Sequence, residues 1–255
     1  MSVVAGDLKI YGAANIAEED VSTQGGAIDT SVRYVFTDAD LANGPSGTVS
    51  VLSDSAGDTT QDVTTTGRDA AGSIVSEALS LNGVTEVDGT QYFDRILKTV
   101  IDGAHAGNVT LQDSSDVDIA VLESGVLSVR RPFYNASANP AGGAAKDYYE
   151  KTFVKNNNAV SALLEAVIIE SADPEGKITF DLEDAVNDTN TSTNRLTAPA
   201  AGMLGSFDSS TKNVPPASGD LGPGSGIGMW MKLSLGAGDA ATKSTWTVQI
   251  SGSTA

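Results

Sequence analysis

The stretch "SDSAGDTTQDVTTTGRDAAGSIVSEALSLNG", Ser53 to Gly83, decides the fold class of this chain. Two of its segments, Gln61 to Asp69 and Gly72 to Gly83, have the length and the Val, Ile and Thr content of strands. The segment "GRDAAG" between them has the composition of a hairpin loop closed by Gly72, and "LNG" begins the next turn. The stretch therefore predicts two strands joined by a tight turn.

The same pattern continues outward along the chain. The runs "SVRYVFTD" (31–38) and "GTVSVLSDS" (47–55) precede the stretch, and the spacing of all four runs is typical of an all-β sandwich. Further on, "LLEAVIIES" and "KITFDL" flank Asp173-Pro174-Glu175-Gly176, where Pro presets the second turn position and Gly closes the reversal. This arrangement predicts a hairpin.

The C-terminal region predicts two amphipathic strands joined by the polar loop "AGDAATK". In "GMWMKLSLG" the apolar residues Met229, Met231, Leu233 and Leu235 fall on one face, and "STWTVQISG" alternates in the same way. Apolar residues also occur at helical spacing in two other segments, "QYFDRILKTVI" and "AVSALLEAVIIE". Periodicity alone does not show whether these segments are helices or strands. Their neighbours favour strands, so we expect both to be strands.

We expect an all-β fold of two β-sandwich or jelly-roll-like modules with extended Gly-rich arms. The segment "NASANPAGGAA" (135–145), where small residues and Pro replace any hydrophobic pattern, is the predicted linker. The N-terminal β module covers residues 1–130 and includes an extended arm, 1–28. The C-terminal β-sandwich module covers 131–255 and is preceded by a Gly/Ala/Pro-rich arm, 134–147.

Two segments hint at an internal duplication. "IYGAANIAEEDVSTQGGAID" and "FYNASANPAGGAAKD" each contain a Tyr, small residues ending in Ala-Asn, and then Gly-Gly-Ala, and an extended aromatic-bearing run follows each. A tandem repeat of one β module is one interpretation. Chance similarity in low-complexity sequence is the other.

The charge and the lack of cysteine narrow the function classes. The chain has 33 acidic and 15 basic residues, a net charge of −18, and no Lys/Arg cluster. A surface this negative repels phosphates, so neither direct nucleic-acid binding nor binding to an anionic membrane is expected. The absence of cysteine excludes disulfides, thiolate metal sites and thiol catalysis.

The aspartates of the deciding stretch raise the question of a calcium site. Neither the segment from Asp38, "DADLANGPSG", nor that from Asp116, "DVDIAVLESG", has the ligand and Gly order of an EF-hand loop, and the deciding stretch lacks the nonapeptide of calcium β-rolls. We therefore interpret the four aspartates as charges on loops and edge strands, with a divalent ion bridging loops or subunits as the alternative. They are Asp54, Asp58, Asp62 and Asp69.

No other motif predicts chemistry. His105, the one histidine, lies in the turn "DGAHAG" without a neighbouring nucleophile motif, and is interpreted as a solvated loop residue. "LGPGSGIG" (221–228) lacks the terminal Lys-Ser/Thr of a P-loop and leads into a strand. We therefore predict no catalytic, metal or cofactor-binding residue, no cofactor, and a protein that is not an enzyme.

Taken together, several phrases carry a resemblance to a known group. They are "YGAAN … GGAI", the deciding stretch itself, "YYEKTFVKNNN", "ADPEGKITF", "TNRLTAPA" and "GMWMKLSLGAGDAATKSTWTVQISG". In these the chain resembles virion structural proteins of tailed bacteriophages, and within that group it is most similar to β-rich head proteins that decorate or cement the capsid. The resemblance covers most of the chain and brings no catalytic residues.

The resemblance implies a trimeric capsid decoration protein, made in the host cytoplasm and located on the virion exterior, whose partner is the major capsid protein. The contacting segments would be the arms, Asp7 to Ile28 and Tyr134 to Tyr149. Four aromatic residues are the candidate anchors, namely Tyr11, Phe133, Tyr148 and Tyr149. Ordinary core packing is the other interpretation of these four.

Two further function classes stay open. A phage tail or baseplate protein, or an adhesin-type receptor-binding β module, is the alternative function, because β-sandwiches with exposed Trp and Tyr also bind glycans. An enzyme acting on cell-wall polymer is disfavoured, because the sequence nominates no pair of carboxylates for hydrolysis.

Overall fold

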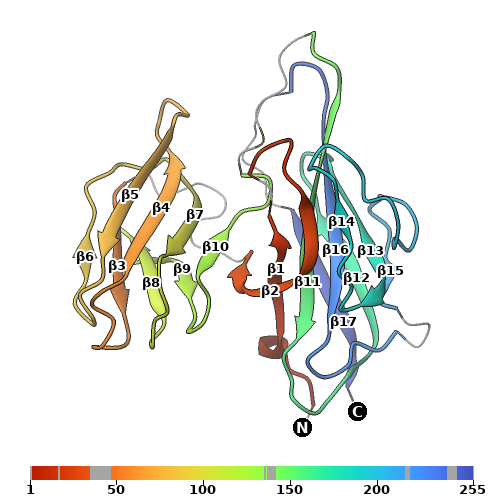
Figure 1. Cartoon of the computed structure of the whole chain (residues 1–255), viewed down its shortest axis with the longest axis horizontal. Coiled ribbons are helices and arrows are strands. Elements are labelled where there is room, and N and C mark those ends of the chain that lie inside the picture. Colours follow the sequence, from red (N-terminus) through yellow and green to blue (C-terminus); the bar gives the residue numbers. More distant parts are fainter. Residues whose placement is uncertain are drawn as a thin grey trace. The chain divides into compact units, whose positions relative to one another are not determined.

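The chain forms two compact units whose regular secondary structure is almost entirely β-strand (Figure 1). The computed structural model describes residues 2–16, 18–34, 47–134, 136, 142–215, 219–239 and 246–254. Within these ranges the helical structure is one short 3₁₀ turn, η1 (Ala5–Asp7), and no helix is long and apolar enough to cross a membrane. The predicted all-β, sandwich-like fold class is confirmed.

The structure divides the chain differently from the sequence prediction at its N-terminus. Unit 1 consists of Met1–Asp29 together with Asn135–Ala255, and unit 2 is Thr30–Tyr134. The predicted arm 1–28 is therefore not a free extension of the first module. Its strand β1 (Leu8–Asn15) is hydrogen-bonded along β11 (Lys146–Asn156), from Leu8 opposite Asn156 to Gly12 opposite Thr152. Six of the fourteen residues of the predicted second arm, 135 and 137–141, lie outside the described residues.

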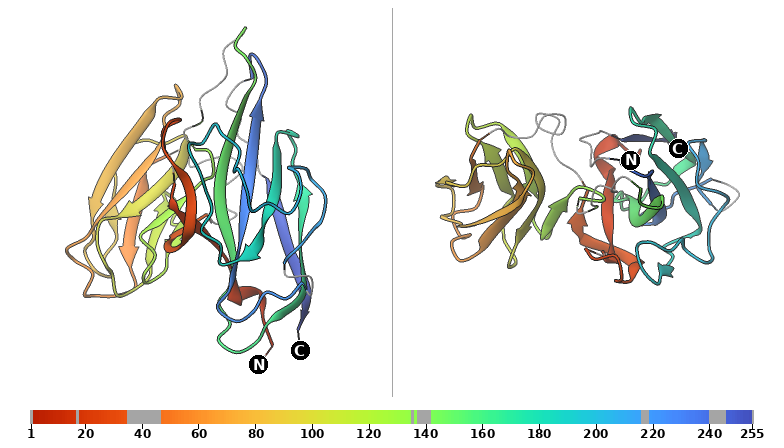
Figure 2. Two further views of the ribbon diagram at one scale, coloured as in Figure 1. Left: turned by 45° about the vertical axis from the view of Figure 1, so that its right-hand side comes forward. Right: turned by 90° about the horizontal axis from the view of Figure 1, so that it is seen from above.

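Unit 1 contains two layers of strands, which can be followed in Figures 1 and 2. One layer runs in the order β13-β16-β11-β1-β2, with β14 beside β2, and the other in the order β15-β12-β17. A ring contact between Phe180 and Trp246, 5.9 Å between centroids, joins the layers. The strands not yet given are β2 (Gln24–Arg33), β12 (Leu163–Ala172), β13 (Ile178–Val186), β14 (Thr191–Ser192), β15 (Lys212–Asn213), β16 (Gly226–Leu235) and β17 (Thr247–Thr254).

The turn predicted at 173–176 is present, but the predicted hairpin is wrong. Gly176 adopts a φ of 62° and its N–H donates to the Asp173 carbonyl oxygen at 3.1 Å. The flanking strands then separate, because β12 pairs with β15 and β17 whereas β13 pairs with β16. Ile168 of β12 and Phe180 of β13 are both fully buried, so each layer contributes an apolar residue to the interior of unit 1.

Unit 2 is also built from two sets of strands around one apolar core. The end of β2 pairs in parallel with β10, and the order continues β10-β7-β4-β5; the second set has the order β6-β3-β8-β9. The core draws on both sets, for example Val51, Val63, Ile96, Leu111 and Val129. The strands are β3 (Val49–Ser53), β4 (Asp62–Arg68), β5 (Ile74–Ser80), β6 (Val87–Asp88), β7 (Arg95–Ile101), β8 (Val109–Asp113), β9 (Asp118–Leu122) and β10 (Ser128–Arg130).

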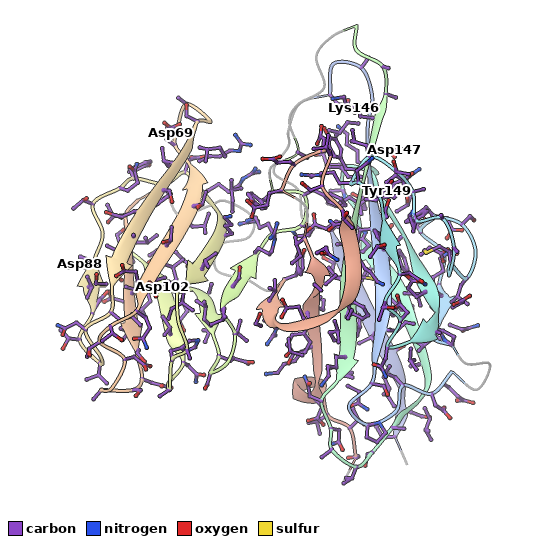
Figure 3. All side chains as sticks on the ribbon, in the orientation of Figure 1. Asp69, Asp88, Asp102, Lys146, Asp147 and Tyr149 are labelled. Atoms are coloured by element: carbon purple, nitrogen blue, oxygen red, sulfur yellow. The ribbon has the colours of Figure 1, made fainter. Side chains whose placement is uncertain are left out.

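Local predictions for the deciding stretch and the two ambiguous segments are confirmed. β4 and β5 form an antiparallel hairpin, and Asp69 lies at its tip (Figure 3), where its Oδ1 accepts the N–H groups of Ala71 and Ser73. Gly72 closes this turn with a φ of 81°. The two segments with helical spacing contain β7 and β12, so both form strands, as expected from their neighbours.

Candidate functional site

The four predicted anchors are all buried within this chain. Tyr11 and Tyr149 are 8% exposed, Phe133 is 7% and Tyr148 is 2% exposed. Tyr11 lies in β1, Tyr148 and Tyr149 are neighbours in β11, and Phe133 belongs to unit 2. The structure therefore does not bring them together on one exposed face, and their burial agrees with the core-packing interpretation.

Each tyrosine of unit 1 has its own partner. Tyr11 Oη accepts a hydrogen bond from Asn157 Nδ2 at 3.1 Å, and the Arg195 guanidinium lies 4.9 Å from the ring centroid of Tyr148. The ring of Tyr149 meets that of Phe207 edge-on at 5.4 Å. Burial raises the pKa of the Tyr149 hydroxyl, as expected for a group held in the interior.

The aspartates of the deciding stretch tie loops together, and one of them is not solvated. Asp58 is 2% exposed, and its carboxylate accepts from Ser53 Oγ at 2.7 Å, from the Ala106 N–H at 2.8 Å and from the Gly107 N–H at 3.0 Å. The interpretation of Asp58 as a surface charge was wrong, because these three donors replace its hydration. Asp54 accepts from the backbone and side chain of Asn108 in the same loop system.

His105 is likewise buried, which corrects its interpretation as a solvated loop residue. It is 6% exposed, and its Nδ1 lies 2.7 Å from the Gly107 carbonyl oxygen while Nε2 lies 2.9 Å from the Val126 carbonyl oxygen. Like Asp58, it fastens the 105–107 loop to the body of unit 2. In the described part of the chain no group of three or more His, Cys, Asp or Glu side chains is arranged to hold a metal ion, and Asp38 lies outside that part.

The most unusual arrangement of charge is in unit 1, in a group of side chains that we call the Lys151 cluster. It consists of Lys151, Glu183, Asp188, Asn190 and Trp230. Lys151 projects from β11, directly opposite Trp230 of β16, while Glu183 belongs to β13 and Asp188 follows that strand. The side chains of Lys151 and Glu183 are fully buried, and that of Asp188 is 4% exposed.

The contacts of the cluster centre on the Lys151 ammonium. Lys151 Nζ donates to Asp188 Oδ1, lies 3.1 Å from Glu183 Oε1, and donates to the carbonyl oxygen of Asn190 at 3.1 Å. Glu183 is held in turn by two donors, with Trp230 Nε1 at 2.6 Å from Oε1 and Asn190 Nδ2 at 2.8 Å from Oε2. Both carboxyl groups therefore lie within hydrogen-bond distance of the Lys151 amine.

Glycines on three surrounding segments make the room that this cluster occupies. A Cβ on Gly228 would come within 2.5 Å of Asp188 Oδ2, 2.7 Å of Glu183 Cγ and 2.8 Å of Lys151 Cε. A Cβ on Gly202 would lie 2.6 Å from Glu183 Oε2, and one on Gly25 would lie 2.9 Å from the Trp230 ring. Any side chain at Gly228 would therefore displace all three charged groups.

The cluster holds one amine and two carboxyl groups away from water. Burial is the largest cause of a raised pKa at Glu183, and the hydrogen bonds from Asn190 and Trp230 oppose it. A protonated carboxyl makes the cluster electrically neutral, whereas two carboxylates beside one ammonium would leave a net buried charge. The aromatic rings of Phe153 and Trp230, with centroids 4.9 and 5.6 Å from Lys151 Nζ, form its apolar walls.

The sequence pattern did not predict this cluster, although one signal for it is present. In "DYYEKTFVKN" the alternation places Lys151 on the same strand face as Tyr149 and Phe153, so a buried face there requires a buried lysine. Glu183 and Asp188 carry no comparable signal, because they are two of 33 acidic residues and only the fold selects them.

Comparison with known proteins gives no match, either to a family model or among curated proteins.

Proposed function

We propose that this chain is a non-enzymatic virion structural protein of a tailed bacteriophage, which decorates or cements the outer surface of the major capsid protein lattice. The observation that carries the proposal is the all-β, sandwich-like architecture of the chain, which is the architecture that the sequence resemblance implies. The net charge of −18 supports it, because an acidic surface stays soluble at high local concentration and is not drawn to nucleic acid.

In the proposed mechanism, binding stabilises the capsid by mass action. A protein that binds only the assembled lattice stabilises that lattice in proportion to its occupancy. A trimer that contacts several coat subunits at once adds modest contacts by multivalency. A stiff β scaffold suits this role, and the buried Lys151 cluster joins β11, β13 and β16 of unit 1 through side chains as well as through backbone hydrogen bonds.

The N-terminal segment and the four aromatic residues are not available as the contact surface for the coat protein. Because β1 and the first part of β2 are strands of unit 1, and Tyr11 is buried there, the N-terminal segment is not a free contacting arm. Contact with the coat protein is therefore assigned to exposed surface and not to the four aromatic anchors.

The experiment that tests the proposal is the copy number of this chain relative to the major coat protein, measured by quantitative mass spectrometry of purified particles. A copy number of the same order as that of the coat protein supports a lattice component. A copy number of a few per particle would move the protein to the tail and favour the receptor-binding alternative, and absence from particles would overturn the virion assignment.

A second measurement tests the mechanism directly. Purified chain added to particles that lack it should bind to saturation and raise the temperature at which the particles release DNA. Sedimentation analysis of the free chain tests the trimer. Saturable binding without any gain in particle stability would contradict the cementing role and leave only decoration.

A further inference from the structure

The geometry of the Lys151 cluster points to a covalent bond, and we propose that Lys151 and Asp188 condense to an amide that cross-links β11 to the segment after β13. Glu183 is the catalytic residue that moves the proton. This inference concerns unit 1 alone and does not depend on where the protein acts.

The reacting atoms are already in place. Lys151 Nζ donates its hydrogen bond to Asp188 Oδ1, so the amine lies beside the carboxyl carbon that it would attack. Both side chains project from segments of one unit, and the carbonyl oxygens of Gly26 and Asn190 help to hold the amine in position. Groups fixed in this way react as if at very high effective concentration, on the order of 10⁵ M or more in well-oriented systems.

The surroundings favour condensation over hydrolysis. The side chains of Lys151 and Glu183 have no solvent exposure, and the Phe153 and Trp230 rings flank the amine. Exclusion of water removes the co-reactant of the reverse reaction. Within the described residues Asp188 Oδ2 is buried without a hydrogen-bond partner, which is costly for a carboxylate and is relieved when one carboxyl oxygen leaves as water.

The reaction balances without any oxidant, reductant or further reactant. A proton passes from the Lys151 ammonium to the Asp188 carboxylate, which yields a neutral amine and a neutral carboxylic acid. The amine nitrogen forms a bond to the carboxyl carbon, and Glu183 donates its proton to the departing hydroxyl. One water molecule leaves, and Glu183 regains a proton from the nitrogen as the amide forms.

Glu183 is placed for that role. Its Oε1 lies 3.1 Å from Lys151 Nζ, and the donors Trp230 Nε1 and Asn190 Nδ2 fix the orientation of its carboxyl group. Burial raises the pKa of Glu183, so Glu183 keeps its proton to a higher pH than a surface glutamate does. With that proton in place the cluster is electrically neutral.

The chain contains matched pairs that should not react. Lys212 Nζ lies 2.8 Å from Asp208 Oδ1, but the Asp208 side chain is 45% exposed. Lys177 Nζ lies 3.3 Å from Asp239 Oδ2, with both side chains partly exposed. In both pairs the carboxylate is open to solvent, although Lys212 itself is mostly buried and also lies 3.7 Å from the buried Asp181 Oδ1. The pairs therefore separate simple closeness of an amine and a carboxylate from closeness in a buried site.

The test is peptide-level mass spectrometry of the folded full-length chain after denaturation and proteolysis. The expected result is a branched peptide that joins the Lys151 and Asp188 segments and is lighter by one water than the sum of the two, with no tryptic cleavage after Lys151. Lys212 and Asp208 should appear only in unlinked peptides. If the segments of Lys151 and Asp188 are recovered only as linear peptides from a natively folded chain, the proposal is wrong.

Two variants test the chemistry. Asp188→Asn keeps the shape of the side chain and should give the same cross-linked product, with ammonia released in place of water. Glu183→Gln should lower the fraction cross-linked at least tenfold while hydrogen-exchange protection of β11 and β16 is retained. Full cross-linking in a folded Glu183→Gln chain would overturn the role of Glu183, and an unlinked but folded Asp188→Asn chain would overturn the assignment of Asp188 as the acceptor.

Discussion

The two units of this chain handle buried charge in opposite ways. In unit 1 an amine and two carboxyl groups lie together in the interior, flanked by aromatic rings on Phe153 and Trp230. In unit 2 the core that joins the two sets of strands is apolar, and the buried polar groups Asp58 and His105 bind loop backbone around residues 105–107. The difference teaches that unit 1 places charged partners between the strands of its sheet, whereas unit 2 uses Asp58 and His105 to fix loops around an apolar core.

The largest expected effect comes from removing the N-terminal segment. Deletion of residues 1–28 should unfold unit 1 and leave unit 2 folded, because β1 lies between β11 and β2 in the middle of a sheet. Hydrogen exchange of peptides from both units measures this. Retained protection across 146–156 would show that β1 is dispensable and that the segment is an arm after all.

Lys151→Met should be the most damaging single substitution in unit 1. Lys151→Met leaves the buried carboxyl groups of Glu183 and Asp188 without their amine, and removal of one partner from a buried ionic group costs about 3–5 kcal/mol of unfolding free energy. Loss of the proposed amide with Asp188 would add to this cost. The matched control is Lys232→Met, because Lys232 is partly exposed, lies 3.7 Å from Asp147, and should cost less than about 1 kcal/mol. Denaturant unfolding measures both, and equal effects of the two substitutions would contradict the importance of the cluster.

Leu111→Ala should destabilise unit 2 to a slightly smaller extent. Leu111 is fully buried in the core of this unit, and a leucine-to-alanine change in such a core costs about 2–5 kcal/mol. Hydrogen exchange should lose protection in the strands of unit 2, β3 to β10, and not in β11 or β16. Equal loss of protection in β11 and β16 would show that the two units unfold together.

The smallest effect is expected from Asp58→Asn, and it should depend on pH. Backbone donation from Ala106 and then the Ser53 hydroxyl lower the pKa of Asp58 below its usual 3.8. A lowered pKa stabilises the fold above the unfolded-state pKa, and this stabilisation is lost as the pH falls through the folded-state pKa. The substitution should therefore cost about 2 kcal/mol at neutral pH and progressively less in acid.

Thermal unfolding of the wild type and the Asp58→Asn variant between neutral and acidic pH checks this expectation. The exposed Asp88 of β6 provides the control, since Asp88→Asn should change stability little at any pH (Figure 3). A constant difference between the Asp58→Asn variant and the wild type across this range would mean that the Asp58 charge does not contribute to stability.

Local structure was largely predictable from the sequence, and the reason is visible in particular residues. Gly72 and Gly176 adopt the positive φ angles that their turns require, and β4 and β5 alternate as their residues indicated. The hairpin at 173–176 failed because turn chemistry fixes the reversal but not the sheet that each strand joins. The N-terminal strands were misassigned because pairing between Leu8 and Asn156 leaves no local trace.

The candidate site was harder to predict for the same reason. A lysine between two aromatic positions could have drawn attention to Lys151. Its partners Glu183 and Asp188 follow in the chain only after β12, a strand of the other layer, and the sheet order β13-β16-β11 brings them back to it. His105 and Asp58 were misread because loops rich in Gly and Asp are usually solvated, and only the structure shows that backbone donors and acceptors surround them here.

The interruption of unit 1 by the whole of unit 2 also sets an order for synthesis. β11 is complete only when roughly 140 residues beyond the end of β1 have been made, or about 7–30 s later at typical elongation rates. Unit 2 is already complete once Tyr134 has been made, about 20 residues before the end of β11. In the last part of that time the growing chain carries a complete unit 2 and a β1 whose β11 edge is still unpaired. Unit 2 should therefore fold first. The yield of native protein should depend on how well β1 is kept from pairing with other chains before β11 is made.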